Sequence, residues 1–243
     1  MHARTFVLAA LVASCATLGA CSSDSVLGLR LDSGTGTGSD TLNNARIRLA
    51  NATATRLDLA SNGVIFAGNA ALDFGQSSSC TPTNAQRPDL TVREAGTLRA
   101  LPGLATAYQS GVNYTVVAYP GSLGTTLFAT IADVFAPIAG QSALRVFNGS
   151  LTGTSYDVYV TDIGAPLATA APQFSNVTGG TFSNFGNASS DTPRQVRITA
   201  TGSKVVLFDA GATALIAGQS VTLVIASPLV GATPLRVFTV SSC

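Results

Sequence analysis

Short apolar stretches with polar residues at alternate positions recur along the chain from Ala45 to the C-terminus. In the segment ARIRLAN, Ile47 and Leu49 alternate with Arg46 and Arg48. Because successive side chains of a β-strand point to opposite faces, this period of two predicts a strand with one buried and one exposed face. We therefore expect a chain built from short, half-buried strands.

A second strand and a hairpin are predicted directly after the first. In the segment RLDLAS, Leu57 and Leu59 alternate with the polar residue Asp58. Asn62 and Gly63 then separate this stretch from another apolar run. Both residue types tolerate a positive φ, so the pair predicts a tight antiparallel hairpin.

The same order of strand patterns occurs twice in the chain. The segment LTVREAGT, residues 90–97, aligns without a gap on VRITATGS, residues 196–203, at an offset of 106. The segment GVNYTVVA, residues 111–118, aligns on GQSVTLVI, residues 218–225, at an offset of 107. Strand type, order and spacing repeat together, which indicates a duplicated unit about the size of one immunoglobulin-like sandwich.

Two shorter matches extend the duplication. Residues 48–51, with the sequence RLAN, match residues 145–148, with the sequence RVFN, at an offset of 97. We also pair Phe74-Gly75 with Phe185-Gly186.

The predicted fold class is all-β, with two tandem immunoglobulin-like antiparallel β-sandwich modules at residues 43–136 and 140–243. Composition agrees, because Lys and Glu occur once each while Val and Thr are frequent. Pro137 and Gly140 mark the boundary between the modules. Residues 21–42, rich in Gly, Ser and Asp, are predicted to form a flexible tether.

Residues 1–20 have the pattern of a lipoprotein signal peptide. A single cation, Arg4, precedes an apolar run that is too short to cross a bilayer as a helix. The residues Leu18-Gly19-Ala20-Cys21 resemble the bacterial lipobox, in which a signal peptidase cuts before the Cys and the thiol receives a diacylglycerol. The resemblance implies that Cys21 is the first mature residue and the lipidation site, so that the membrane is a partner through this anchor. The alternative is ordinary cleavage, which would leave Cys21 as a spare thiol.

The residue after Cys21 bears on location. In Gram-negative lipoproteins, an Asp at this position favours retention in the inner membrane, whereas this chain has Ser22. The resemblance therefore points to the outer membrane, with the protein facing either the periplasm or the cell surface.

Charge and histidine content exclude several function classes. Removal of residues 1–20 leaves 12 basic and 12 acidic residues, a balance that gives no argument for nucleic acid as a partner. The only histidine, His2, lies in the leader, so the mature chain lacks the residue needed for Ser-His-Asp or Cys-His catalysis and for a His-ligated metal. We predict no enzymatic activity, no catalytic residue, no cofactor and no metal site.

The cysteines predict one disulfide. Cys15 leaves with the leader and Cys21 is assigned to the lipid, which leaves Cys80 and Cys243 in an oxidising compartment. We predict a bond between them. The alternative is two unpaired thiols, which would hold if their Cα atoms lay more than about 7 Å apart.

Nearly all of the mature chain resembles a known family, although the first copy is more divergent and keeps only Leu57-Asp58-Leu59 at the second strand. The segments LRVFNGSLTGTSYDVYV, RQVRITATGSKVVLFD and GQSVTLVIAS are similar to an uncharacterised family of bacterial secreted and lipid-anchored proteins, a domain of unknown function with immunoglobulin-like β modules, often in tandem. Arg145-Val146 and the run Asp-Val-Tyr-Val at 157–160 match its hallmark strands, whereas SLTGTS replaces the usual Pro-Asp-Ala-Pro turn. The resemblance implies a fold and a location but no activity.

Candidate site chemistry is sparse. Asp58 and Asp157 occupy matching positions in the two copies, and in half-exposed strands we expect them to be solvated or paired with Arg. Asp157 and Asp162 are too few for a calcium site, and Glu94 is the only glutamate that could join an Asp in glycoside hydrolysis. Among the tyrosines, Tyr159 alternates with its apolar neighbours, so we expect it to face outward.

Three function classes follow. The first is a non-enzymatic envelope lipoprotein that serves as a structural, adhesion or interaction module. The second is a lipoprotein that binds a glycan or a protein ligand, which an exposed aromatic patch or a concave face would favour. The third is an outer-membrane β-barrel, disfavoured because Arg and Asp recur on strand faces where a lipid-facing apolar belt is needed. The sequence identifies neither the ligand nor the oligomeric state.

Overall fold

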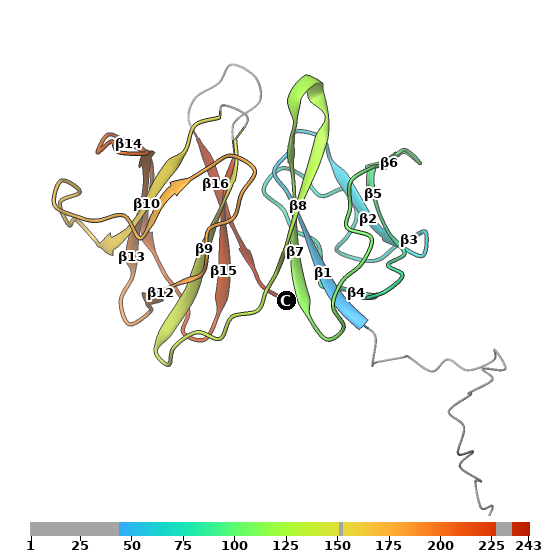
Figure 1. Ribbon diagram of the computed structural model, residues 1–243, viewed down its shortest axis with the longest axis horizontal. Coiled ribbons are helices and arrows are strands. Elements are labelled where there is room, and N and C mark those ends of the chain that lie inside the picture. Colours follow the sequence, from blue (N-terminus) through green and yellow to red (C-terminus); the bar gives the residue numbers. More distant parts are fainter. Residues whose placement is uncertain (1–43, 151–152, 227–234) are drawn as a thin grey trace, which may run out of the picture. The chain divides into compact units, whose positions relative to one another are not determined.

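The computed structural model describes residues 44–150, 153–226 and 235–243, and these residues form sixteen β-strands (Figure 1). The first eight are β1 (Asn44–Asn51), β2 (Leu57–Ser61), β3 (Val64–Ile65), β4 (Thr81–Asn84), β5 (Leu90–Glu94), β6 (Ala100–Leu101), β7 (Asn113–Pro120) and β8 (Thr126–Ala132). The second eight are β9 (Gln141–Gly149), β10 (Tyr156–Asp162), β11 (Phe174–Val177), β12 (Gly186–Ser189), β13 (Arg194–Ala200), β14 (Val206–Thr213), β15 (Ser220–Ala226) and β16 (Arg236–Ser241). The predicted leader, the tether at 21–42 and Cys21 lie outside the described residues.

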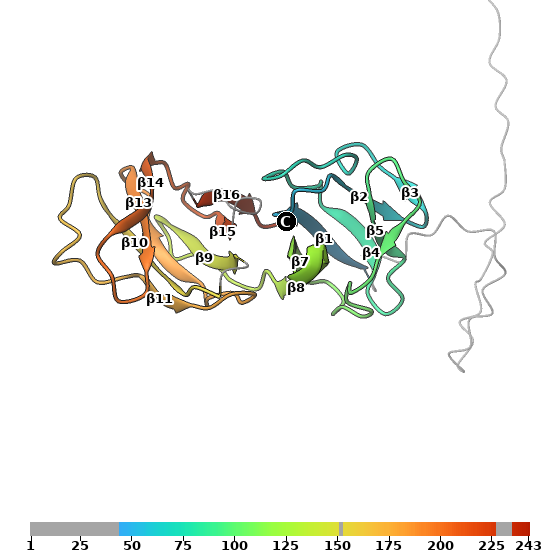
Figure 2. The same cartoon turned by 90° about the horizontal axis from the view of Figure 1, so that it is seen from above.

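The strands form four sheets of four strands each. In the first sandwich, the order β4-β1-β7-β8 makes one sheet, here called the first contact sheet, and the order β3-β2-β5-β6 makes the first outer sheet. In the second sandwich, β12-β9-β15-β16 makes the second contact sheet and β11-β10-β13-β14 the second outer sheet, and Figure 2 shows these two layers. All pairings are antiparallel except β1 with β7 and β9 with β15. The fold is therefore all-β with two sandwiches, as predicted.

The two sandwiches have the same topology, because adding eight to each strand number of the first gives the strand order of the second. In the central pairings, β1–β7 with β9–β15 and β2–β5 with β10–β13, the registers agree residue by residue. Asp58 lies opposite Arg93 and Asp157 opposite Thr199, which confirms the predicted offset of 106. Arg48 lies opposite Thr115 and Arg145 opposite Thr222, which confirms the offsets of 97 and 107.

One predicted match is wrong. The backbone N–H of Gly75 donates to the carbonyl of Asn51 at 2.8 Å, and the N–H of Gly180 donates to the carbonyl of Asn148 at 2.7 Å. Gly180, and not Gly186, is therefore the counterpart of Gly75, at an offset of 105. The similarity of the two Phe-Gly pairs is local, and the backbone pairing overrides it.

Each sandwich has its own apolar core. Ile47 and Leu49, predicted to face inward, are fully buried in the first core, whereas Arg46 is exposed. The second core contains Val158 and Ile198, which are opposite each other in adjacent strands. Alternation along each strand thus produces the buried face on which the sandwich is built.

The predicted hairpin is present between β2 and β3. Ser61 pairs with Val64, and the two central residues, Asn62 and Gly63, have φ values of 50° and 74°. Two consecutive positive φ angles are the requirement of the tight turn that Asn-Gly favours.

A third apolar cluster joins the two contact sheets. Ala50 and Val117 of the first sheet pack with Phe147, Val224 and other residues of the second. These side chains are on the faces opposite the two sandwich cores, so each contact sheet is covered on both sides. The residues that flank this cluster form the site described next.

Candidate functional site

A buried ion pair lies where the two sandwiches meet. Arg145, on β9, bonds through Nη2 to Oδ1 of Asp133, just after β8, and the exposed fractions of the two side chains are 0% and 1%. Arg145 also donates from Nε to Oγ1 of Thr222 at 2.8 Å and from Nη1 to the carbonyl of Ala132 at 3.1 Å. Every nitrogen of this guanidinium therefore has an acceptor, as a buried charge requires.

The carboxylate of Asp133 has further donors. Thr115 Oγ1 lies 3.0 Å from both carboxylate oxygens, and the backbone N–H of Cys243 also donates to Asp133. Burial raises the pKa of Asp133 above its ordinary value, while Arg145, Thr115 and Cys243 act in the opposite direction. Burial likewise lowers the pKa of Arg145, against the attraction of Asp133.

Aromatic rings cover the buried cation. The guanidinium carbon of Arg145 lies 4.5 Å from the ring centre of Phe185 and 5.2 Å from that of Phe182. Phe185 in turn stacks on Phe135, with the ring centres 5.0 Å apart. These rings exclude water from the ion pair and add cation–π attraction.

A reciprocal bond crosses the same contact from Arg48, which lies close enough to Asp133 to be attracted by its carboxylate. Arg48, the counterpart of Arg145, donates from Nη1 to the carbonyl of Ser241, the residue of β16 that corresponds to Ala132 of β8. Each sandwich thus uses the same arginine to bond the same edge-strand carbonyl of the other. Such reciprocity is the property of an isologous interface, here between two halves of one chain.

The predicted disulfide is confirmed. Cys80 precedes β4 in the first sandwich, and Cys243 follows β16 in the second. Their sulfur atoms are bonded, and their Cα atoms are 5.7 Å apart. A sequence separation of 163 residues makes this bond a covalent link across the contact.

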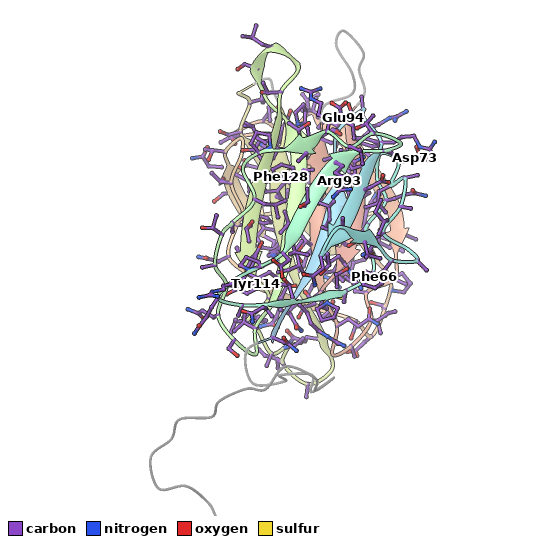
Figure 3. The ribbon with its side chains drawn as sticks, turned by 90° about the vertical axis from the view of Figure 1, so that its right-hand side faces the viewer. Phe66, Asp73, Arg93, Glu94, Tyr114 and Phe128 are labelled. Carbon is purple, nitrogen blue, oxygen red and sulfur yellow. A yellow bond between two sulfur atoms is a disulfide. The ribbon has the colours of Figure 1, made fainter. Side chains whose placement is uncertain are left out.

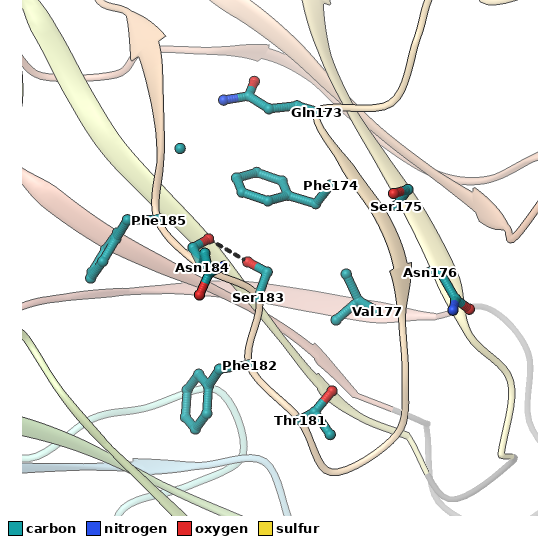
Figure 4. Close-up of a pocket in the computed structure, with 11 residues that line it drawn as sticks. Gln173, Phe174, Ser175, Asn176, Val177, Thr181, Phe182, Ser183, Asn184 and Phe185 are labelled. Atoms are coloured by element: carbon teal, nitrogen blue, oxygen red, sulfur yellow. Dashed lines mark hydrogen bonds between the residues drawn. The ribbon is translucent and has the colours of Figure 1, made fainter.

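A separate groove lies in the second sandwich, between the edge strand β11 and the segment before β12 (Figure 4). Its volume is about 410 Å³. Phe174, Val177 and Phe182 supply apolar surface, and the polar groups are the amides and hydroxyls of Gln173, Ser175, Asn176, Thr181, Ser183 and Asn184. The residues that line this groove include no ionisable side chain, so its chemistry suits an uncharged ligand.

The two predicted surface aspartates are buried, which corrects the expectation that they are solvated or paired with Arg. Asp58 accepts the backbone N–H of Ala71 at 2.6 Å. Asp157 accepts those of Asn176 at 2.8 Å and Gly202 at 2.9 Å. Because Ala71 and Asn176 both have φ near 50°, these carboxylates hold strained turns of the same kind in both sandwiches.

Tyr159 is also buried, so its prediction as an outward-facing aromatic is wrong. Its side chain is on the outer face of β10, in the predicted phase, but only 1% of it is exposed. Lys204 Nζ lies 4.6 Å from the ring centre and 3.2 Å from the Oη, and it also donates to the carbonyl of Ala170 at 2.6 Å. A turn and a loop therefore cover this face.

The remaining predicted acids do not converge. Asp162 bonds Arg194, and Glu94 bonds Arg99 at 2.8 Å. Among the residues that the structure describes, no three His, Cys, Asp or Glu side chains form a group that could hold a metal ion.

Sequence reasoning missed the Asp133–Arg145 pair. The available signal was the matching arginine at positions 48 and 145, noted only as part of the duplication. The carboxylate has no counterpart in the second copy, where Ser242 stands at the position equivalent to Asp133.

Comparisons with known proteins provide no family. No family model matches the chain, and a search of the curated proteins finds no match. Within the described ranges, no helix is long and apolar enough to cross a membrane. The resemblance to a bacterial domain of unknown function stays a prediction.

Proposed function

We propose that this protein is a non-enzymatic lipoprotein of the cell envelope whose two locked β-sandwiches act as a structural, adhesion or interaction module. Acylation of Cys21 would provide the membrane anchor, and Ser22 would direct it to the outer membrane. The observation that carries the proposal is that three separate features link the sandwiches: a disulfide, a buried ion pair and an apolar cluster.

This joining has a mechanical consequence. Two domains linked only by a peptide would move independently, whereas a covalent bond and a desolvated contact keep their surfaces in one arrangement. A fixed pair of sandwiches on an anchored tether is suited to spacing or presenting a surface at the membrane.

The anchor is tested by Cys21→Ser, with Cys15→Ser as the matched control inside the leader. Radiolabelled palmitate should label the wild type and Cys15→Ser, and both should fractionate with the outer membrane. Cys21→Ser should lose the label. If Cys21→Ser keeps the label, or if the mature chain begins at another residue, the lipoprotein assignment is wrong.

The locked arrangement is tested by small-angle X-ray scattering of the mature chain carrying Cys21→Ser. The scattering curve of this parent chain should fit one conformation. Adding Cys80→Ser, Cys243→Ser and Arg145→Met to the parent chain should increase the radius of gyration. A broad distribution of conformations in the parent chain would contradict the role of a rigid module.

The groove in the second sandwich favours a second function, the binding of a neutral glycan or an uncharged peptide. Asn184→Ala should weaken binding of a neutral oligosaccharide measured by calorimetry, because it removes an amide from the lining. Gln86→Ala, an exposed amide in the first sandwich, is the control. Equal binding by both variants would exclude the groove as the site.

A further inference from the structure

The edge strands of the four sheets differ in how they are protected from pairing with another chain. Natural proteins blunt edges with short strands, proline, bulges or charge. β3 and β6 have two residues each, β4 contains Pro82, β11 is short and has a register shift, and β12 is short and begins with Gly186. β14 is long, but it has two register shifts and a residue with positive φ, Gly211.

β8 lacks all of these features. Its seven residues, TLFATIA, include no charge, no proline and no glycine, and all seven pair with β7 in one continuous register. The N–H of Gly121 bonds the carbonyl of Thr125, and the N–H of Asp133 bonds that of Asn113. In the alternating antiparallel ladder, the backbone groups of residues 126, 128, 130 and 132 therefore point away from β7.

These outward groups are free over most of the strand. The carbonyl of Ala132 accepts Arg145 Nη1. In the part of the chain that the structure describes, no hydrogen bond reaches the N–H or C=O of Thr126, Phe128 or Thr130. All three residues are partly exposed, and Figure 3 labels Phe128 in the view of the first sandwich. Unpaired backbone groups in a regular row are a template for another strand.

The equivalent edge, β16, is closed at one position. Its outward residues are Val237, Thr239 and Ser241, and the carbonyl of Ser241 accepts Arg48. The hydrogen bond from Arg48 thus closes one of the three outward positions on β16. On β8, the equivalent bond from Arg145 reaches Ala132 and leaves the other three outward residues free. Arg236 adds a charge at the other end of β16.

We propose that β8 is a dimerisation edge that pairs antiparallel with β8 of a second copy of this chain. The register that uses all three free residues, and avoids Ala132, places Phe128 opposite Phe128 and Thr126 opposite Thr130 on both sides of the axis. Aromatic and Thr–Thr pairs are favourable cross-strand neighbours. On the other face Leu127, which is 44% exposed, lies opposite Ala129. No like charges meet. In the dimer, the first contact sheet of one copy and the first contact sheet of the other join into one eight-stranded sheet.

The first test uses Thr130→Pro in the mature chain with Cys21→Ser, which is independent of the lipid anchor. Residue 130 does not donate to β7, so proline removes only an outward donor and leaves the internal ladder intact. Thr130→Ala keeps the N–H and is the matched control. Sedimentation equilibrium should give twice the monomer mass for the parent chain and Thr130→Ala, and the monomer mass for Thr130→Pro. A monomeric parent chain, or a dimeric Thr130→Pro, would overturn the proposal.

The second test depends on register and not on stability. Residues opposite each other in a hydrogen-bonded pair have Cα atoms about 5.5 Å apart, within the range of a disulfide. A mixture of chains with Thr126→Cys and chains with Thr130→Cys should oxidise to the mixed dimer, identified by non-reducing peptide mapping. Preferential formation of either homodimer would contradict the proposed register of the β8 pair. Cross-linking to an unrelated protein in cells in place of a second copy would also reject self-pairing.

Discussion

Arg48 and Arg145 occupy equivalent positions in the two sandwiches, and each donates to the last edge-strand carbonyl of the other sandwich. The two are not energetically equal. Arg145 is fully buried and bonds Asp133, whereas Arg48 is partly exposed and faces the carbonyls of Ser241 and Ser242. The contact is therefore reciprocal in its backbone bonds and asymmetric in its charge.

This asymmetry predicts unequal effects of the same substitution. Arg145→Met leaves the Asp133 carboxylate buried without its cation and should lower the free energy of unfolding by about 3–5 kcal/mol. Arg48→Met removes hydrogen bonds to carbonyls and the attraction between Arg48 and Asp133, but no direct ion pair, and should lower it by about 1–2 kcal/mol. Urea unfolding of both variants measures the difference. Equal losses would mean that the ion pair adds nothing beyond its backbone bonds.

Because of Tyr108, we expect the free energy of unfolding to depend on pH in the alkaline range. Burial, followed by the nearby Tyr114, raises its pKa from 10.0 to about 12. The folded state therefore holds this proton more tightly than the unfolded state. The resulting stability is fully present below about pH 10 and is lost as the pH rises through about 12. Urea unfolding at increasing pH should show a steeper loss for the wild type than for Tyr108→Phe.

The same tyrosine pair predicts opposite effects at neutral pH. The Tyr108 hydroxyl is buried, and no residue that the structure describes forms a hydrogen bond with it, so Tyr108→Phe should raise the free energy of unfolding by about 1 kcal/mol. The Tyr114 hydroxyl accepts the N–H of Gln109 at 2.9 Å. Tyr114→Phe should therefore lower the free energy of unfolding by about 1 kcal/mol. A loss of stability in Tyr108→Phe would show that its hydroxyl has a partner in solution.

The disulfide predicts a stability that depends on reductant. Its sequence separation of 163 residues corresponds to a loop-closure term of about 5 kcal/mol at most. Cys80→Ser with Cys243→Ser should lower the melting temperature, and reductant should then have no further effect. Without the substitutions, reductant should shift the melting temperature to that of the double variant. A melting temperature independent of reductant in the parent chain would show that the thiols are unpaired in solution.

We expect similar losses of stability when Asn51 and Asn148, which occupy equivalent positions in the two sandwiches, are replaced. Asn51 Nδ2 donates to the carbonyls of Thr55 and Leu72, and its Oδ1 accepts the N–H of Thr53. Asn148 makes the same three bonds with the counterparts of these residues. Because both amides are fully buried, substitution by Ala should lower the free energy of unfolding by about 2–4 kcal/mol in each case. Asn184→Ala, at an exposed position, is the control and should change it by less than about 0.5 kcal/mol.

Much of the fold was predictable because the alternation of apolar and polar residues shows which face of a strand is buried. Ile47 and Leu49 predicted the buried face, and Asn62 and Gly63 predicted the hairpin. The offsets of the duplication matched the registers of the central strands. The disulfide followed from counting cysteines and was confirmed. These features depend on residues near each other in sequence or on the matching of two copies.

The three errors about exposure have one physical origin. Asp58, Asp157 and Tyr159 were assigned to a solvent-exposed side from their phase along a strand. The phase is correct for Tyr159, but loops from distant parts of the chain cover the outer sheets and bury these side chains. Periodicity specifies the side of the sheet and contains no information about what packs on it.

From the sequence alone, alternation, turn residues and the internal duplication determined that the chain forms two similar sandwiches. The cysteine count determined which pair joins them. The contact between the sandwiches was decided only in three dimensions. Arg145 and Asp133 are ordinary surface residue types whose burial depends on two sheets meeting face to face. A charge becomes part of a buried pair only when the chain removes it from water, and that desolvation is a property of the assembled structure.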